Sequence, residues 1–225
     1  IPLRLVGSEM CIRDSAKAAG KRALLIEGGP YGTTCARVGC MPSKLLIAAA
    51  EAAHNAAHTE PFGVHVQGEI AVDGVAVMDR VKRERDRFVG FVLEGVENIP
   101  AEDKIRGYAR FVSDTVLRVD EHTEIHASRV VIATGSRPAV PPPFRGLGDR
   151  LVLNDDVFAC DDLPRRVAVF GPGVIGLELG QALARLGVEV RVFGVSGSLG
   201  GISDPQVRHS ARKICLLYTS DAADE

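Results

Sequence analysis

The chain has 225 residues, 46% of them hydrophobic, and a formal net charge of −2 at pH 7. A chain of this length can bury one large core or two small ones. The small net charge gives no general attraction to nucleic acid or anionic membrane, and no apolar run is long enough to span a bilayer. We therefore expect a soluble, cytoplasmic protein that binds neither nucleic acid nor membrane.

Both ends of the sequence differ in character from what lies between them. Residues 6–15 and 215–225 resemble translated adapters from sequencing libraries. We therefore expect residues 1–15 and 215–225 to be non-native, and they carry no weight in predicting the fold. Of the five cysteines, Cys35, Cys40 and Cys160 then remain. Cys160 is predicted to be an ordinary buried or linker thiol.

The segment after residue 15 is typical of the middle of a dinucleotide-binding unit. Residues 16–20 predict a helix end with Gly20 as its C-cap, and residues 22–26 predict a buried parallel strand. Glu27 follows this strand, where a carboxylate accepts hydrogen bonds from an adenosine ribose; the alternative is a solvated charge at a strand end. A first strand and a Gly-x-Gly-x-x-Gly turn should come before, so this domain is predicted to be incomplete.

Residues 27–44 place two cysteines between a glycine-rich turn and the start of a helix predicted over residues 43–57. A thiol at a helix N-terminus faces the positive end of the peptide dipoles, which favours the nucleophilic thiolate. A structural disulfide between Cys35 and Cys40, or two buried thiols, is the alternative, but the disulfide would close a very short loop and add little stability. Because no secretion signal is identifiable, the pair indicates a redox-active dithiol.

The segment from Gly28 to Lys44 reads Gly-Gly-x-x-Gly-Thr-x-Cys-x-x-x-Gly-Cys-x-Pro-Ser-Lys. It resembles the active-site segment of the class I pyridine nucleotide-disulfide oxidoreductases, flavoproteins that include dihydrolipoyl dehydrogenase, glutathione reductase and mercuric reductase. The resemblance implies that Cys35 exchanges with substrate, that Cys40 lies against the flavin and that Lys44 lies near the flavin ring. It further implies cofactor contacts from Glu27, Gly28, Gly32, Thr33 and Thr34. Ser43 favours dihydrolipoyl dehydrogenase over glutathione reductase, which usually has a lysine there.

Two further stretches follow the first helix. Residues 75–98 place apolar and charged positions at helical spacing and predict a long amphipathic helix whose charged face meets solvent or a second subunit. His54 and His58 are four positions apart, a spacing that can hold a metal. No third ligand accompanies them, so we expect an exposed helix face and no metal site.

A β-rich stretch comes next. Residues 105–111, 115–119 and 123–127 alternate apolar and polar positions and predict a small antiparallel meander, and residues 129–133 predict a buried strand. Two short segments in this stretch resemble further parts of the family. The segment that touches the adenine end of the flavin nucleotide would be Gly107, Tyr108 and Ala109, and the turn that passes close to that nucleotide would be Ala133, Thr134 and Gly135.

A connector rich in proline and glycine, residues 139–163, is predicted to separate two domains. A strand then runs into a Gly-x-Gly-x-x-Gly turn, and a helix, a cap at Gly187 and a strand over residues 188–193 follow. Such glycines permit a tight turn and let backbone amides approach a pyrophosphate. We therefore predict NAD or NADP binding by Gly171, Gly173, Val174, Ile175 and Gly176.

The nicotinamide cofactor stays undecided between NAD and NADP. An acidic residue usually follows the second strand and holds the ribose 2′-hydroxyl of NAD, whereas this chain has Gly194. Arg191 lies inside the strand, and Asp204 lies too far beyond the end of the strand, so neither residue distinguishes NAD from NADP. Glu178 resembles the family glutamate that pairs with the lysine beside the flavin, which implies an ion pair between Glu178 and Lys44.

The sequence thus predicts an α/β fold with two incomplete Rossmann-like domains and a small antiparallel β meander. The FAD-binding domain would cover residues 16–138 and the start of the NAD(P)-binding domain residues 164–214. The resemblance implies an enzyme that passes electrons between NAD(P)H, FAD and the Cys35/Cys40 pair, with a small-molecule or protein-bound dithiol as partner and dihydrolipoamide as the first candidate. Mercuric reductase or a related flavoprotein reductase, a non-enzymatic dithiol redox sensor, and a plain Rossmann module with structural cysteines are the alternatives.

Two features of the complete family are absent from these residues. They are the flavin pyrophosphate turn and the C-terminal interface domain, which carries a His-Glu acid/base pair across a homodimer. We therefore expect a homodimeric parent protein to hold the activity, and these 225 residues alone to be inactive.

Overall fold

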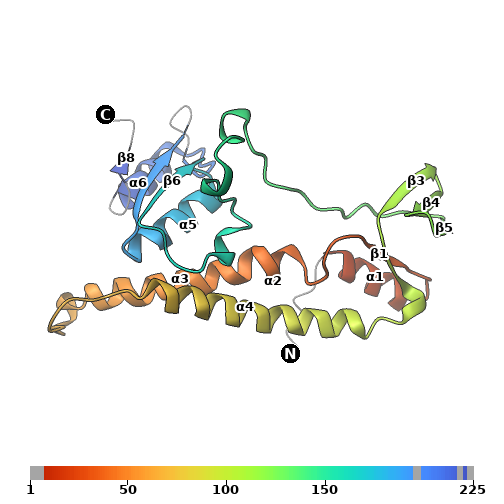
Figure 1. The fold of residues 1–225 in the computed structure, drawn as a ribbon, viewed down its shortest axis with the longest axis horizontal. Coiled ribbons are helices and arrows are strands. Elements are labelled where there is room, and N and C mark those ends of the chain that lie inside the picture. The colour runs from red at the N-terminus through yellow and green to blue at the C-terminus, as the bar shows by residue number, and fades with distance from the viewer. Residues whose placement is uncertain (1–7, 195–198, 217–219, 222–225) are drawn as a thin grey trace. The chain divides into compact units, whose positions relative to one another are not determined.

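The computed structural model describes residues 8–194, 199–216 and 220–221. The chain forms two compact units, residues 1–37 with 86–139 and residues 38–85 with 140–225 (Figure 1). Parts of the predicted non-native ends, residues 1–7, 217–219 and 222–225, lie outside the described residues. The predicted domain boundaries stay a prediction.

The first unit combines short parallel strands with an antiparallel meander. Strands β1 (Leu25–Glu27) and β2 (Lys104–Arg106) pair in parallel, and β3 (Ala109–Ser113), β4 (Val116–Val119) and β5 (Thr123–His126) form an antiparallel sheet in that order. The unit also contains α1 (Ser8–Ala18), the start of α2 (Thr34–Val38), a 3-10 turn (Ala101–Asp103) and residues 86–97 of α4 (Gly74–Glu97). The predicted meander is therefore confirmed.

The prediction of one strand over residues 105–111 was wrong, because Gly107 divides it. Gly107 has a φ of +148°, a conformation that favours glycine, and its amide donates to the carbonyl of Glu27 at 3.0 Å. The chain bends there, so that β2 joins β1 while β3 opens the meander (Figure 1).

The prediction of a buried strand over residues 129–133 was also wrong. Residues 129–141 form neither helix nor strand, and Val131 and Ile132 are 61% and 71% exposed. An apolar run becomes a buried parallel strand only beside strands that supply hydrogen bonds. In the described part of this unit the parallel sheet consists of β1 and β2, and neither pairs with this run.

The predicted glycine C-caps are confirmed at two helix ends. At the end of α1, the amide of Gly20 donates to the carbonyl of Lys17 and the amide of Lys21 to that of Ala16, both at 2.9 Å. This is a Schellman motif, which needs a left-handed residue, and Gly20 has a φ of +71°. Gly187 repeats the arrangement after α5 (Val174–Arg185) with a φ of +90°.

The second unit contains the predicted strand–turn–helix–strand of a dinucleotide-binding fold. Strand β6 (Arg166–Phe170) leads through α5 to β7 (Glu189–Phe193), which pairs with it in parallel, and β8 (Ser220–Asp221) pairs with β7. The unit also holds α3 (Cys40–Ala57), residues 74–85 of α4, α6 (Pro205–Leu216) and four 3-10 turns, at Glu60–Phe62, Pro142–Phe144, Gly148–Arg150 and Val157–Ala159.

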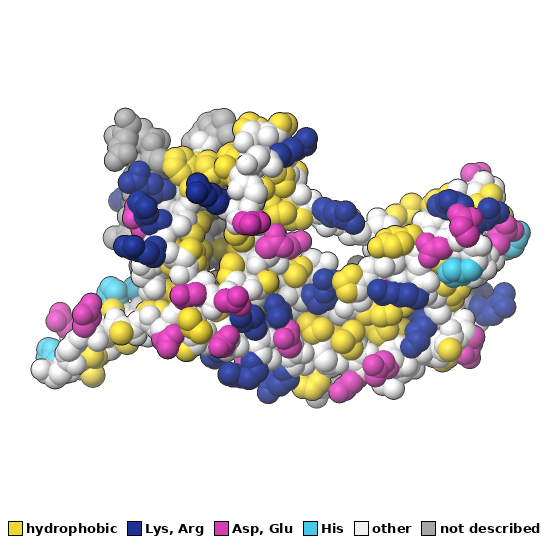
Figure 2. Space-filling view, viewed as in Figure 1, with side chains coloured by type: hydrophobic (Ala, Val, Ile, Leu, Met, Phe, Trp, Pro, Cys, Tyr) yellow, Lys and Arg dark blue, Asp and Glu magenta, His cyan; other side chains and the backbone are white. Residues whose placement is uncertain are grey.

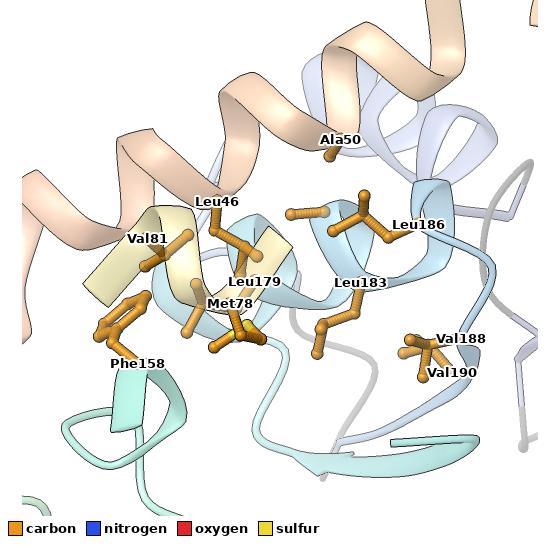
Figure 3. Close-up of a cluster of buried hydrophobic side chains, with 11 residues drawn as sticks. Leu46, Ala50, Met78, Val81, Phe158, Leu179, Leu183, Leu186, Val188 and Val190 are labelled. Carbon is orange, nitrogen blue, oxygen red and sulfur yellow. The ribbon is translucent and has the colours of Figure 1, made fainter. Parts of the chain in front are cut away.

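One hydrophobic core holds the second unit together (Figure 3). Leu46 on α3 points towards Leu179 on α5, and Met78 and Val81 of α4 complete the cluster with Phe158. Phe158 is only 2% exposed although it lies in the segment predicted as a connector. Part of that segment is therefore packed into the core.

Charged side chains of both signs alternate along α4 (Figure 2). Lys82 lies 2.8 Å from Asp161 and 3.5 Å from Asp79, which ties α4 to the segment after Phe158. The hydrogen bond from Lys82 holds the pKa of Asp161 below its usual range, and in turn Asp161 raises the pKa of Lys82. Among the described residues, no helix combines the length and apolar character needed to cross a membrane.

The core predicts a large loss of stability on truncation of Leu46. Leu46→Ala removes a fully buried side chain at the contact between α3 and α5, and we expect the free energy of unfolding to fall by about 2–5 kcal/mol. Urea unfolding followed by circular dichroism measures this change. Val75→Ala is the matched control, because Val75 is half exposed and its truncation should cost less than about 0.5 kcal/mol. Equal losses in the two variants would contradict the assigned core.

Candidate functional site

The turn after β1 lies against the segment that begins β3. Glu27 ends β1, and one of its carboxylate oxygens accepts the amide of Gly29 at 2.6 Å. A Cβ on Gly28 would overlap the ring of Tyr108, so the absence of a side chain lets that ring lie over the turn. The structure thus brings together four predicted cofactor residues, Glu27, Gly28, Gly107 and Tyr108.

The next residues of the turn are held in an uncommon conformation. Gly32 has a φ of +113°, and a Cβ there would meet Arg37 and Val89 at 3.1 Å. Thr33 has a φ of +60°, which is costly for a residue with a side chain, and its hydroxyl accepts the amide of Ala36 at 3.2 Å. Such strained positions cluster at functional sites. Here the strained pair comes immediately before α2, which begins at Thr34.

Each cysteine of the dithiol lies in the first turn of a helix. Cys35 is the second residue of α2 and half-buried, while Cys40 is the first residue of α3 and exposed. The prediction that the helix begins at Ser43 was wrong by three residues, because the helical turn already starts after Gly39. No side chain caps α3 at Gly39. Cys40 therefore lies where backbone amides lack partners within the helix.

The predicted ion pair between Lys44 and Glu178 is confirmed. Lys44 Nζ lies 3.1 Å from Glu178 Oε1, and the pair joins α3 to α5. Lys44 follows Cys40 by four positions and so lies on the same face of α3. Its side chain is 65% exposed and that of Glu178 28%, so water screens the attraction and the pair contributes little stability.

The Gly-x-Gly-x-x-Gly turn between β6 and α5 has the close approaches that its glycines predict. Gly171 has a φ of +111°, and its amide donates to the carbonyl of Phe193 at 2.8 Å. A Cβ on Gly176 would overlap the carbonyl oxygen of Gly171, so α5 can begin this close to the turn only with glycine there. A Cβ on Gly173 would meet nothing within 4 Å, which leaves open space above the turn. The turn therefore has the shape that receives a pyrophosphate.

The other predicted cofactor residues are exposed. Val174 and Ile175 lie in the first turn of α5, and Ala109 begins β3. The segment from Ala133 to Gly135 lies outside any helix or strand, and Gly135 has a φ of +68°. The predicted place of this segment beside a flavin nucleotide stays a prediction.

The rings of His54 and His58 lie side by side on α3, tilted by 39°. Their ring centroids are 4.1 Å apart, and the ring Nδ1 of His58 lies 2.7 Å from the carbonyl oxygen of His54. Partial burial lowers the pKa of His54, and the neighbouring Arg185 and His58 lower it further. Within the described residues, no group of three or more His, Cys, Asp or Glu side chains is arranged to hold a metal ion.

Sequence reasoning missed one residue of the glycine turn, Pro172. A Cβ on Gly194 would lie 2.5 Å from Pro172 Cγ, and the carbonyl of Pro172 accepts the amide of Gly200. The turn is therefore in contact with the chain that follows β7. The sequence did contain a signal for this contact: a proline lies inside the turn, and a glycine stands after β7 where an acidic residue is usual.

The parallel βαβ unit with its glycine turn and the two cysteines at helix starts are features of a nucleotide-binding redox protein. Residues 6–215 match the sequence profile of the pyridine nucleotide-disulphide oxidoreductases, and the chain belongs to this family. The family uses FAD and NAD(P).

Similar curated proteins include dihydrolipoyl dehydrogenases and a mycothione reductase. Dihydrolipoyl dehydrogenase 2 of Haloarcula marismortui is 34% identical over 182 residues, 77% of this chain and 37% of the relative. Dihydrolipoyl dehydrogenase of Chlamydia trachomatis is 30% identical over 200 residues, 86% and 42% of the two chains. Mycothione reductase of Mycobacterium tuberculosis is 32% identical over 225 residues, 96% and 46%. The chain thus spans less than half the length of these relatives.

A solved structure supports the fold. The HOCl-induced flavoprotein disulfide reductase RclA of Escherichia coli superposes with a TM-score of 0.78 over 96% of this chain and 46% of its own, at 24% sequence identity. The predicted α/β fold with nucleotide-binding domains and a small antiparallel sheet is therefore confirmed.

The approach of α5 to its turn predicts opposite outcomes for two glycines of the same helix. Gly176→Ala forces a methyl group onto the carbonyl of Gly171, and we expect a loss of about 1–3 kcal/mol in the free energy of unfolding. Gly180→Ala is the control, because its Cβ would meet Val190 at an ordinary 3.6 Å and alanine favours the helix by about 1 kcal/mol. Urea unfolding measures both. A loss at Gly180 as large as that at Gly176 would contradict the steric argument.

The ion pair on α3 predicts a small energetic coupling. In a double-mutant cycle of Lys44→Met and Glu178→Gln, we expect a coupling energy of at most about 1 kcal/mol in the free energy of unfolding, since Lys44 is well exposed. Chemical denaturation of the four proteins measures it. A coupling above about 2 kcal/mol would show that the pair is a structural link instead.

Proposed function

We propose that the protein is an NAD(P)-dependent flavoprotein disulfide oxidoreductase in which Cys35 and Cys40 form the redox-active dithiol. The observation that carries the proposal is the position of Cys40 as the first residue of α3, one helical turn before a lysine paired to α5. The family match over residues 6–215 supports it. Membership alone does not say which cysteines react, so the roles rest on this local geometry and on the segment's resemblance to the family's active site.

Thiol–disulfide exchange assigns the two sulfurs different tasks. In the oxidised protein, a thiolate of the substrate dithiol attacks the sulfur of Cys35 and releases Cys40 as a thiolate. The second substrate thiol then attacks the mixed disulfide and leaves the substrate as a disulfide, with Cys35 reduced. The substrate has lost two electrons and two protons. The Cys35/Cys40 pair has gained both electrons and, with Cys40 as a thiolate, one proton, and the other proton passes to solvent. Cys40 is released at the uncapped start of α3, where the first backbone amides have no partner within the helix.

Residues of both glycine turns would hold the cofactors. FAD would be held by Lys44 and by the first unit through Glu27, Gly28, Gly32, Thr33, Thr34, Gly107, Tyr108, Ala109, Ala133, Thr134 and Gly135. NAD(P) would be held by Gly171, Gly173, Val174, Ile175 and Gly176. When bound, FAD supplies the two-electron transfer between the nicotinamide and the dithiol. The Lys44–Glu178 pair orients the lysine, which keeps a positive charge on the Cys40 face of α3.

Dihydrolipoamide is the first substrate candidate. Dihydrolipoyl dehydrogenases at 30% and 34% identity, and Ser43 in the active-site segment, support this choice. The disulfide of a small thiol is the second candidate, because mycothione reductase is 32% identical over a longer stretch. Mercuric reductase or a related flavoprotein reductase stays an alternative within the class. We further propose a homodimer in the cytoplasm, as the family resemblance implies.

Absorption spectroscopy tests the assigned cysteine roles on protein expressed from the complete gene. We expect a yellow, flavin-bound protein that develops a long-wavelength band on reduction, since a Cys40 thiolate would lie beside the flavin. Cys40→Ser should abolish the band, whereas Cys35→Ser should keep it and lower dithiol oxidation at least 100-fold. Cys160→Ser is the control and should match wild type in both measurements. A band that survives in Cys40→Ser would overturn the assignment.

The same preparation separates the enzyme from a redox sensor. Consumption of NAD(P)H or NAD(P)⁺ in step with dithiol chemistry supports the oxidoreductase. A colourless protein whose Cys35 and Cys40 oxidise reversibly without any turnover of nicotinamide cofactor would instead support a sensor.

A further inference from the structure

Asp120 is the first residue of the tight turn between β4 and β5, and its backbone has a φ of +45°. Few residues other than glycine adopt this left-handed conformation, and aspartate and asparagine adopt it more often than most. Glycine would meet the demand of the turn equally well. The turn therefore does not explain the carboxylate at position 120, whereas the contacts of that carboxylate do.

Asp120 is bound to Tyr108 through both its backbone and its side chain. The amide of Asp120 donates to the carbonyl of Tyr108 at 3.0 Å, which continues the pairing of β3 with β4 and does not depend on the side chain. The amide of Tyr108 donates in turn to Oδ1 of Asp120 at 3.2 Å. This second bond is what an aspartate adds to the pairing.

The same carboxylate lies against the bend at Gly107. A Cβ on Gly107 would overlap Oδ2 of Asp120 and would lie 2.6 Å from Cγ1 of Val119. Gly107 has a φ of +148°, and its amide donates to the carbonyl of Glu27 at 3.0 Å. The bend between β2 and β3 is therefore held from two sides, by the end of β1 and by the carboxylate of the meander turn.

This bend carries Tyr108 onto the turn that follows β1. The ring of Tyr108 occupies the space that a side chain on Gly28 would take. Glu27 accepts the amide of Gly29 with one carboxylate oxygen at 2.6 Å, and among the described residues nothing donates to the other oxygen. That oxygen can accept a ribose hydroxyl, as the carboxylate after the second strand does in dinucleotide-binding folds. The residues present therefore fit the FAD contacts that we assign to them.

We propose that Asp120 is a positioning residue for FAD, because its carboxylate holds the segment of Gly107 and Tyr108 on the Gly28 turn before the cofactor binds. The proposal rests on the assignment of these residues to FAD under the proposed function. Asp120 acts through the backbone of Tyr108 and needs no contact with FAD. A segment already held in its binding position loses less conformational freedom when a ligand arrives, so the ligand binds more tightly.

Asp120→Gly tests the carboxylate alone, since glycine keeps the left-handed turn and the backbone bond to Tyr108. Quenching of flavin fluorescence measures the Kd of FAD for apoprotein prepared from the complete gene. We expect this Kd to rise about three- to tenfold, the effect of one lost hydrogen bond, while the melting temperature of the apoprotein stays within about 3 °C of wild type. Hydrogen exchange at the Tyr108 amide should become at least threefold faster in the apoprotein, a readout that needs no cofactor.

Two further variants separate positioning from other effects. Asp120→Asn is the conservative variant, because asparagine tolerates the left-handed conformation and keeps a carbonyl oxygen for the Tyr108 amide. We expect its Kd for FAD to lie within twofold of wild type. Glu121→Ala is the matched control in the same turn, where Glu121 forms an exposed ion pair with Arg110 at 2.8 Å. It should leave both the Kd for FAD and the exchange at Tyr108 unchanged.

The possible outcomes distinguish this inference from the proposed function. A wild-type protein that binds no FAD overturns the proposed function, and the role of Asp120 with it. Tight FAD binding by wild type with an equal Kd in Asp120→Gly overturns the role of Asp120 alone. Equal losses of affinity in Asp120→Gly and Asp120→Asn would also overturn it, because the charge and not the bond to Tyr108 would then matter. A fall of more than about 8 °C in the melting temperature of Asp120→Gly would assign the carboxylate a purely structural role instead.

Discussion

Burial of Leu46 and Leu179 at the contact between α3 and α5 is the constraint on which the second unit depends. Each helix begins at a position to which we assign a role under the proposed function: α3 starts with Cys40, and α5 starts at the Gly-x-Gly-x-x-Gly turn. Burying one leucine is worth about 1.5–3 kcal/mol, whereas an exposed ion pair is worth about 0–1 kcal/mol. Packing therefore holds the two helices together. The Lys44–Glu178 pair orients the lysine side chain at the end of α3 where the chemistry is proposed.

Local patterns predicted most of the elements, because periodicity and glycine caps act within a few residues of the chain. The helix over residues 75–98, the βαβ unit and the meander were found in this way. The strand predictions failed where pairing with a strand far away in the sequence determines the structure. Residues 129–133 have the composition of a buried strand, but no described strand pairs with them. Residues 105–111 alternate correctly, yet Gly107 turns the chain so that its first part pairs with β1.

The candidate site was less predictable from local sequence patterns than the helices and strands were. Lys44 and Glu178 are 134 positions apart, so no local pattern links them, and the resemblance to a family supplied the pairing that the structure confirms. Thr33 could not be singled out as strained, because the sequence does not encode a backbone angle directly. Pro172 was missed for another reason. Its ring lies where a side chain at position 194 would be, and the sequence does not show that the glycine there is in contact with a proline 22 positions earlier.

The two units differ in the residue at the end of the strand that follows the first helix of each nucleotide-binding fold. In the first unit Glu27 ends the strand that follows α1, and its carboxylate is retained and held by the amide of Gly29. In the second unit Gly194 stands at the corresponding place after α5 and β7, where Pro172 excludes any side chain. Under the proposed function this difference has a chemical reason. The ribose of FAD always carries a free 2′-hydroxyl, so a carboxylate is compatible there, whereas the nicotinamide cofactors occur with and without a 2′-phosphate that a carboxylate would repel.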